Sequence, residues 1–197
     1  KNKGLDIIGL SLGEPDFNTP EFIKDAAIQA VKDNWNSYSP VDGYADLKES
    51  ICLKFKRDNG LNYNPSQVVV STGAKQSIAN VCMVLLNPGD EVLLPAPYWV
   101  SYSAIATLAE AKSVIIPSSI ETDFKITPDQ LENAITPKTK LVMFNSPNNP
   151  SGTIYTEAEY RALGKVLEKY PDIHILSDEI YEHINYGTDH FSIADIP

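Results

Sequence analysis

The sequence has 197 residues, of which 43% are hydrophobic and 21% charged, a composition typical of one folded globular domain or slightly more. The formal net charge of −10 argues against nucleic acid or an anionic membrane as the main partner, and no apolar run has the length of a membrane span. Cys52 and Cys82 lie outside any CxxC or Cys/His cluster, so we expect free thiols in the cytoplasm and neither a disulfide framework nor a metal site.

Helices and strands alternate along the chain. Apolar residues at helical spacing predict helices over 19–33 and about 44–59, and Gly60 ends the second of them. Short apolar or β-branched runs predict strands at 67–71, 91–95, 113–117, 140–147 and 173–177, with helices between most of them. This alternation predicts an α/β fold with a mostly parallel sheet and helices on both faces. In such sheets, ligands bind at the carboxyl ends of the strands.

Capping residues predict where two of the later helices begin. Thr127 precedes Pro128, which suits the first turn of a short helix. Thr156 and Glu159 have the spacing of a capping box at the start of a longer helix. Both helices are therefore expected to start one residue after the threonine.

A glycine turn follows the predicted strand 67–71. Gly73 permits a tight turn, and the N–H groups of Ala74 and Lys75 at the start of the next helix can bind an anion such as phosphate. A plain strand-to-helix turn explains the same residues when the motif stands alone. Neither GxxxxGK[ST] nor GxGxxG is present, which argues against a nucleotide-binding α/β domain.

Polar or aromatic side chains follow three other strands. X-Pro steps stiffen the backbone around Asn149, whose amide can then donate to a ligand oxygen or simply cap a turn. Asp178 ends an apolar strand, where it can cap the next element or hold a protonated ligand nitrogen. Glu179 is interpreted as structural or solvated. Trp99, near the start of a helix, belongs either to a core or to a surface on which a flat ring stacks.

Six motifs carry a resemblance to a known family. SLGEPDF, YSPVDGYADLKE, STGAKQ, PAPYWVSY, NSPNNPSG and SDEIYE occur in family order from about Gly4 to the end of the sequence. The sequence resembles class I aminotransferases, which are fold-type I enzymes that use pyridoxal 5′-phosphate. The motif wording is most similar to the bacterial aspartate aminotransferase subgroup. The resemblance implies transfer of an amino group between an amino acid, such as aspartate, and a 2-oxo acid in amino acid metabolism and biosynthesis.

The resemblance also implies roles for residues that bind the phosphate and stack on the ring. Gly73, Ala74 and Lys75 would form the phosphate cradle, mainly through backbone N–H groups. Trp99 would stack on the pyridine ring and lie near the substrate. These positions therefore join the glycine turn and the tryptophan into one expected site.

The same resemblance implies contacts at the other edge of the ring and with the substrate. Asn149 and Tyr181 would donate to the ring oxygen O3′, Asn149 would also contact the substrate, and Asp178 would pair with the protonated ring nitrogen. Gly13 would lie against the substrate α-carboxylate. Tyr38 would reach the cofactor phosphate of a partner subunit, which implies a homodimer.

Two groups of the family have no counterpart in this sequence. The lysine that forms the Schiff base and the arginine that binds the substrate carboxylate belong to later segments, so no catalytic residue is expected within the 197 residues. We therefore expect a part of a longer protein, inactive alone. Residues 1–18 are assigned to a segment associated with the small domain, and residues 19–197 to an incomplete large domain that binds the cofactor.

Other functions fit parts of the same pattern. Another fold-type I enzyme, such as a C–S lyase or a cyclopropane-carboxylate synthase, would have similar cofactor residues. A non-catalytic module that binds pyridoxal phosphate, such as the sensor domain of a regulator, is a further alternative. The products of a half-reaction distinguish an aminotransferase from a lyase. Reconstitution with the cofactor tests the non-catalytic module.

Overall fold

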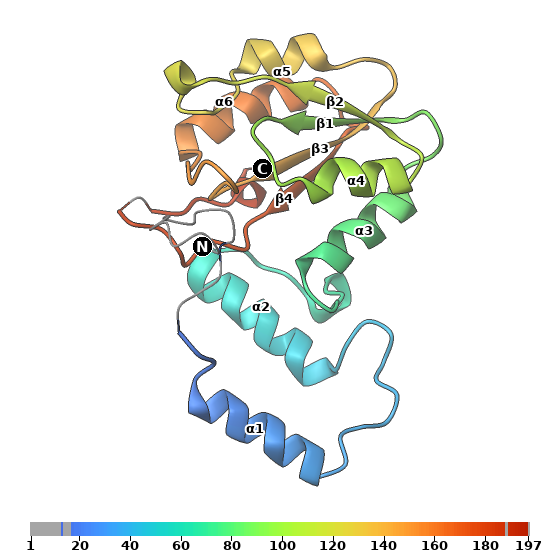
Figure 1. The fold of residues 1–197 in the computed structure, drawn as a ribbon, viewed down its shortest axis with the longest axis vertical. Coiled ribbons are helices and arrows are strands. Elements are labelled where there is room, and N and C mark those ends of the chain that lie inside the picture. Colours follow the sequence, from blue (N-terminus) through green and yellow to red (C-terminus); the bar gives the residue numbers. More distant parts are fainter. Residues whose placement is uncertain (1–12, 14–16, 188, 197) are drawn as a thin grey trace, which may run out of the picture. The chain divides into compact units, whose positions relative to one another are not determined.

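The computed structural model describes residue 13, residues 17–187 and residues 189–196, and it divides the chain into two units, 1–40 and 41–197. The first unit contains α1 (Glu21–Lys32), which lies within the predicted range 19–33 (Figure 1). None of the α1 side chains is buried, and Phe22 and Val31 are 74% and 70% exposed. The proposed domain division after residue 18 stays a prediction.

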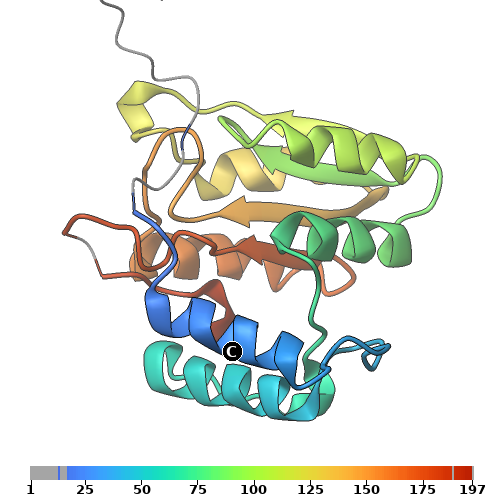
Figure 2. The same cartoon turned by 60° about the horizontal axis from the view of Figure 1, so that its bottom comes forward.

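Four strands form the sheet of the second unit, in the order β2-β1-β3-β4 (Figures 1 and 2). Their bounds are β1 Glu91–Pro95, β2 Lys112–Ile116, β3 Thr139–Asn145 and β4 His174–Asp178. Every pairing is parallel, as the sequence predicted. The register between β3 and β4 sets Asn145 opposite Asp178, so two polar strand ends lie side by side at the carboxyl edge.

From α3 onward helices alternate with these strands, and the helices begin and end close to their predicted positions. Their bounds are α2 Ala45–Asn59, α3 Ala74–Leu85, α4 Ser101–Leu108, α5 Pro128–Ala134 and α6 Glu157–Leu167, with 3-10 turns at Pro65–Gln67, Ile120–Thr122 and Ile193–Asp195. Gly60 ends α2 in a left-handed conformation, with φ of 71°. The side chains of Thr127 and Thr156 accept from the N–H groups of Gln130 and Glu159, which confirms both predicted caps.

The two central strands, β1 and β3, are mostly buried, and alternate residues of a strand point to opposite sides of the sheet. Val92 and Leu94 of β1 join a core with α3 and α4, where Cys82 is fully buried. Leu93, between them, joins the other core with α5 and α6. Figures 1 and 2 show these helix pairs on opposite sides of the sheet. The prediction of helices on both faces is therefore confirmed.

One predicted strand is wrong. Residues 67–71 form no strand, because Gln67 ends a 3-10 turn and no residue of the run enters a ladder with another strand in the described part of the chain. Val68 keeps an extended conformation, and Val70 donates its N–H to the carbonyl of Asp42 at 3.1 Å. The β-branched run thus sets an extended backbone, but a strand also requires a paired neighbour.

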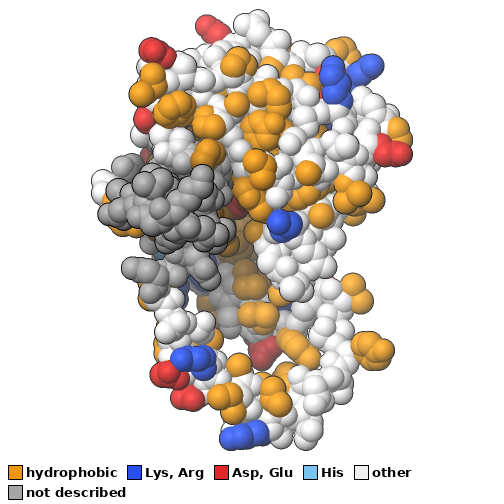
Figure 3. All heavy atoms as spheres, viewed as in Figure 1, with side chains coloured by type: hydrophobic (Ala, Val, Ile, Leu, Met, Phe, Trp, Pro, Cys, Tyr) orange, Lys and Arg blue, Asp and Glu red, His pale blue; other side chains and the backbone are white. Residues whose placement is uncertain are grey.

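Apolar side chains also reach the surface of the second unit, where Figure 3 shows them scattered among polar groups. Val84, Val100 and Leu108 are examples, exposed at 81%, 77% and 68%. Within the described residues, no helix combines the length and apolar character that crossing a membrane requires.

Candidate functional site

A cavity of about 150 Å³ lies at the carboxyl edge of the sheet, where β3 and β4 end. Its lining comes from four places in the chain: the start of α3, the start of α4, the end of β3 with the loop after it, and the end of β4 with the turn after it. The lining residues are Ala74, Trp99, Tyr102, Asn145, Asn149, Asp178, Ile180 and Tyr181. The edge that the parallel sheet predicted as a ligand site is therefore hollow.

The start of α3 forms one wall of the cavity. Gly73 immediately precedes the helix with φ of 83°, a left-handed conformation that glycine adopts without strain. The N–H groups of Ala74 and Lys75 belong to the first turn, where the helix supplies no acceptor and its dipole favours an anion. The ammonium group of Lys75 lies 4.9 Å from the ring centroid of Trp99, which adds positive charge beside the cavity.

Asp178 ends β4 and also lines the cavity. One carboxylate oxygen accepts from the hydroxyl of Tyr102 at 2.7 Å, and the other accepts from the N–H of Ile180 at 3.3 Å. No ion pair among the described residues involves Asp178. A part-buried carboxylate with only neutral donors is suited to hold a cationic group of a ligand.

Tyr102 is a permanent donor to this carboxylate. The side chain is 1% exposed, and burial, with the nearby charge of Asp178, raises the pKa of Tyr102 well above its usual value. The hydroxyl therefore keeps its proton and cannot repel Asp178 by ionising. Its ring meets that of Trp99 edge to face, with centroids 5.6 Å apart, so Tyr102 of α4 packs against Trp99 in the loop before that helix.

Asn145 joins the two strand ends that carry the site. Its side-chain amide donates to the backbone carbonyl of Asp178 at 2.8 Å, and its side-chain oxygen accepts from the backbone N–H of Asn149 at 2.7 Å. Asn149 in turn approaches the hydroxyl of Tyr181 at 3.4 Å, the long end of hydrogen-bond distances. One buried amide thus fixes Asp178 relative to the Asn149 loop.

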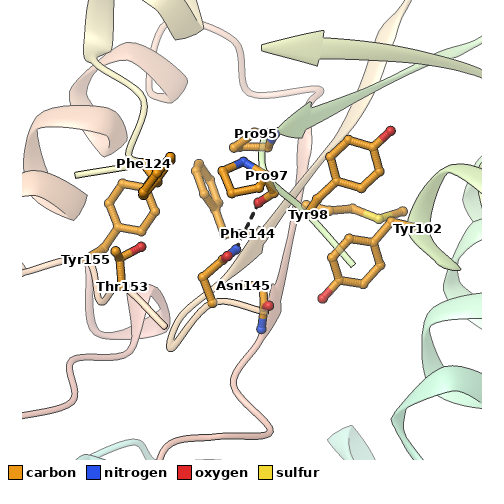
Figure 4. A pocket seen from close by; sticks show the side chains of 11 residues that line it. Pro95, Pro97, Tyr98, Tyr102, Phe124, Phe144, Asn145, Thr153 and Tyr155 are labelled. Carbon is orange, nitrogen blue, oxygen red and sulfur yellow. Dashed lines mark hydrogen bonds between the residues drawn. The ribbon is translucent and has the colours of Figure 1, made fainter. Parts of the chain in front are cut away.

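A second, narrower hollow of about 10 Å³ adjoins the cavity and shares Tyr102 and Asn145 with it. Figure 4 shows Tyr98 and Tyr102 on one side of it and Tyr155 and Phe124 on the other, with Phe144 between. The dashed line in that view is the bond from the amide of Asn148 to the carbonyl of Pro97, at 3.2 Å. This packing fixes the loop after β1 against the loop after β3, beside the site.

The structure brings together most, but not all, of the residues that the sequence singled out. Ala74, Trp99, Asn149, Asp178 and Tyr181 line one cavity. Lys75 does not line the cavity itself, but its ammonium group lies against the ring of Trp99, which does. Gly73 holds the turn before α3 and does not itself line the cavity.

Two predicted residues belong to the first unit and are described there alone. Gly13 is exposed, and a methyl group on its α-carbon would meet no described atom within 4 Å beyond its chain neighbours. Tyr38 is fully exposed. The predicted roles of both residues stay predictions.

Tyr102 and Asn145 were not predicted as site residues, and Glu179 was left between two interpretations. Tyr102 lies three residues after Trp99, one helical turn away, which was a usable signal. Asn145 is the last residue of β3 and so had the same placement as Asp178. Glu179 accepts hydrogen bonds from Ser177 and Ser192, which supports the structural interpretation.

A family comparison assigns the chain. The model described as "Aminotransferase class I and II" matches residues 5–196. The chain belongs to the class I and II aminotransferase family. The resemblance that the six motifs carried is thereby confirmed, and so is the pyridoxal-phosphate-dependent transferase fold.

Individual members of the aminotransferase family agree with this assignment. The chain is 53% identical to an aspartate/prephenate aminotransferase of Nitrosomonas europaea, over 97% of its own length and 48% of the relative. It is 50% identical to an aspartate aminotransferase of Bacillus subtilis, over 100% of its length and 50% of the relative. The crystal structure of an aspartate aminotransferase from Rhizobium meliloti superposes with a TM-score of 0.94 at 45% identity, covering 98% of this chain and 48% of the other. The chain thus spans about half the length of these relatives.

Pyridoxal 5′-phosphate is the cofactor of this aminotransferase family, and the cavity has groups that fit it. The start of α3 offers N–H groups and Lys75 a positive charge for a phosphate. Trp99 offers an aromatic surface, and Asp178 is a carboxylate that no cation of the described chain neutralises. Anion site, aromatic surface and acid surround one space, as a phosphorylated pyridinium compound requires.

Proposed function

We propose that the whole protein is an aminotransferase that moves the amino group of aspartate or a similar amino acid to a 2-oxo acid. The observation that carries this proposal is the cavity that Asp178 and the start of α3 line together. The names of the relatives, aspartate aminotransferase and aspartate/prephenate aminotransferase, support an acidic amino acid as donor and add prephenate as a candidate acceptor.

The proposed roles follow from the chemistry of each wall. Gly73, Ala74 and Lys75 bind the phosphate, Trp99 stacks on the ring, and Asp178 keeps the ring nitrogen protonated. When bound, the cofactor supplies an electron sink for the pair released at the α-carbon of the amino acid. Asp178, oriented by Tyr102, strengthens that sink because its negative charge favours the protonated nitrogen.

Asn149 and Tyr181 are proposed to donate to the ring oxygen, because their side chains approach each other at 3.4 Å on the cavity wall. Gly13 is proposed to contact the substrate carboxylate, and Asn149 and Trp99 to contact the substrate as well. Tyr38 is proposed to serve a partner subunit of a homodimer. A cytoplasmic location is also part of the proposal, supported by free rather than paired cysteines.

A half-reaction tests the proposal. The whole protein, loaded with pyridoxal phosphate and mixed with aspartate but no acceptor, is expected to form oxaloacetate in an amount equal to its active sites and then stop. Adding 2-oxoglutarate restores turnover, because the amino group must leave before the next cycle. Continuous release of ammonia with no acceptor would instead indicate a lyase on the same scaffold.

Replacing Tyr102 with phenylalanine is expected to slow amino-group transfer about tenfold, because the carboxylate of Asp178 loses the hydrogen bond that the hydroxyl of Tyr102 donates to it. The matched control is Tyr155→Phe, which removes the hydroxyl that accepts from the N–H of Ile126 at 2.9 Å, away from the larger cavity. Both variants should lose similar stability in chemical denaturation. Only Tyr102→Phe should lose activity, and equal losses in the two would show that Tyr102 acts through stability alone.

A further inference from the structure

The turn that follows β4 contains residues that line the cavity and residues that do not. Asp178, Ile180 and Tyr181 line it, whereas Glu179 and Glu182 do not. Residues 179–182 belong to no strand or helix, and the turn has few backbone bonds of its own, such as Glu182 N–H to the carbonyl of Glu179 at 3.0 Å. A segment without a ladder must be held by its side chains if its cavity residues are to keep fixed positions.

Glu179 anchors the first end of the turn. One of its carboxylate oxygens accepts from the hydroxyl of Ser177 at 2.7 Å and from that of Ser192 at 2.9 Å. The other lies 2.9 Å from the Nε2 atom of His190. The side chains of Glu179 and His190 are only 18% and 8% exposed, so this carboxylate is held by donors from both sides of the turn. The side chain of Glu179 therefore links the end of β4 to residues 190–192.

Glu182 anchors the second end of the turn to α2. Its carboxylate accepts from the amide of Asn59 at 2.9 Å and pairs with the ammonium group of Lys54. Burial alone raises the pKa of the Glu182 carboxyl, but the bonds from Asn59 and Lys54 outweigh burial and hold that pKa below its usual value. The amide of Asn185 also donates to the backbone carbonyl of Glu182 at 3.2 Å. Glu182 therefore stays ionised and joined to a helix that is remote in sequence.

We propose that Glu179 and Glu182 are positioning residues that hold Asp178 and Tyr181 at their places in the cavity, a role that rests on the proposed function of those two residues. Each anchor directly follows the residue that it positions: Glu179 follows Asp178, and Glu182 follows Tyr181. Neither carboxylate lines the cavity, so neither acts on a ligand directly. Their effect is on geometry: loss of an anchor lets the turn move, and Tyr181 then meets its ligand oxygen less often.

The test uses the whole protein loaded with pyridoxal phosphate and three glutamate-to-glutamine variants. Glu179→Gln and Glu182→Gln keep the shape of the side chain and remove its charge. Glu132→Gln is the matched control, since Glu132 of α5 forms an ion pair with Lys169 at 2.8 Å and both side chains are about half exposed, at 41% and 55%. Each variant is compared with wild type for kcat and KM with aspartate, hydrogen exchange of residues 179–187, and the pH at which the absorbance of the bound cofactor changes.

The two anchor variants are expected to lower kcat about 5- to 50-fold with a smaller change in KM, because a misplaced group costs rate even when substrate still binds. Exchange in 179–187 should rise, and the pH of the absorbance change should shift, because Tyr181 donates to the cofactor oxygen that sets it. Glu132→Gln should match wild type in all three measurements. Combining Lys54→Met with Glu182→Gln should lower kcat little more than either change alone, because both substitutions remove the same ion pair, Lys54–Glu182.

Two outcomes overturn the inference, and they are distinguishable from failure of the proposed function. The first is anchor variants that match wild type in kcat and in the pH of the absorbance change while wild type still forms oxaloacetate stoichiometrically. The second is loss of activity with unchanged exchange in 179–187. If wild type forms no oxaloacetate, the proposed function fails, and the positioning role fails with it.

Discussion

Replacing Asp178 with alanine is expected to slow amino-group transfer by the whole protein about 100- to 1,000-fold, the range found when an oriented electrostatic group is removed from an active site. The carboxylate lines the cavity, and no cation among the described residues neutralises it. Its charge is therefore available to keep the ring nitrogen of the cofactor protonated. The single-turnover rate of oxaloacetate formation from aspartate measures the loss, and a thermal unfolding curve shows whether the variant is folded.

Two further variants separate the charge of Asp178 from its shape. Asp178→Asn keeps an acceptor for the hydroxyl of Tyr102 but carries no charge, so it should be nearly as slow as the alanine variant. Asp129→Asn is the matched control, an exposed acid in the first turn of α5 that should leave the rate unchanged. A wild-type rate in Asp178→Asn would show that the assignment of this charge is wrong.

The sheet and its helices were predictable because their signals are local. The left-handed Gly60 ends α2, and the side chains of Thr127 and Thr156 cap the helices that follow them. The prediction of a strand at 67–71 was wrong because a strand requires a paired neighbour, and a β-branched run does not show whether one is present. Local chemistry thus predicted where elements begin and end but not which of them pair.

The cavity was only partly predictable, for a related reason. Asp178 and Asn149 were found because a polar residue at a strand end implies a ligand or a cap. Tyr102 and Asn145 act instead on other protein groups: Tyr102 donates to Asp178, and Asn145 bridges Asp178 to Asn149. Such residues become visible only when the register of the sheet sets β3 beside β4. Glu179 was underestimated in the same way, since its partners include Ser192, which is 13 residues away.

Replacing Asn145 with alanine is expected to lower the free energy of unfolding by about 2–3 kcal/mol, because the N–H of Asn149 loses its acceptor and the carbonyl of Asp178 keeps only the N–H of Ser146, at 3.3 Å. Asn145 is 6% exposed, and its amide is the acceptor for Asn149 N–H and a donor to the carbonyl of Asp178. Chemical denaturation measures the loss, with the exposed Asn62→Ala as control. Loss of the bridge also leaves the Asn149 loop without its side-chain link to the end of β4, so affinity for pyridoxal phosphate should fall in the same variant. Unfolding at the wild-type denaturant concentration would show that this bridge does not hold the two strand ends together.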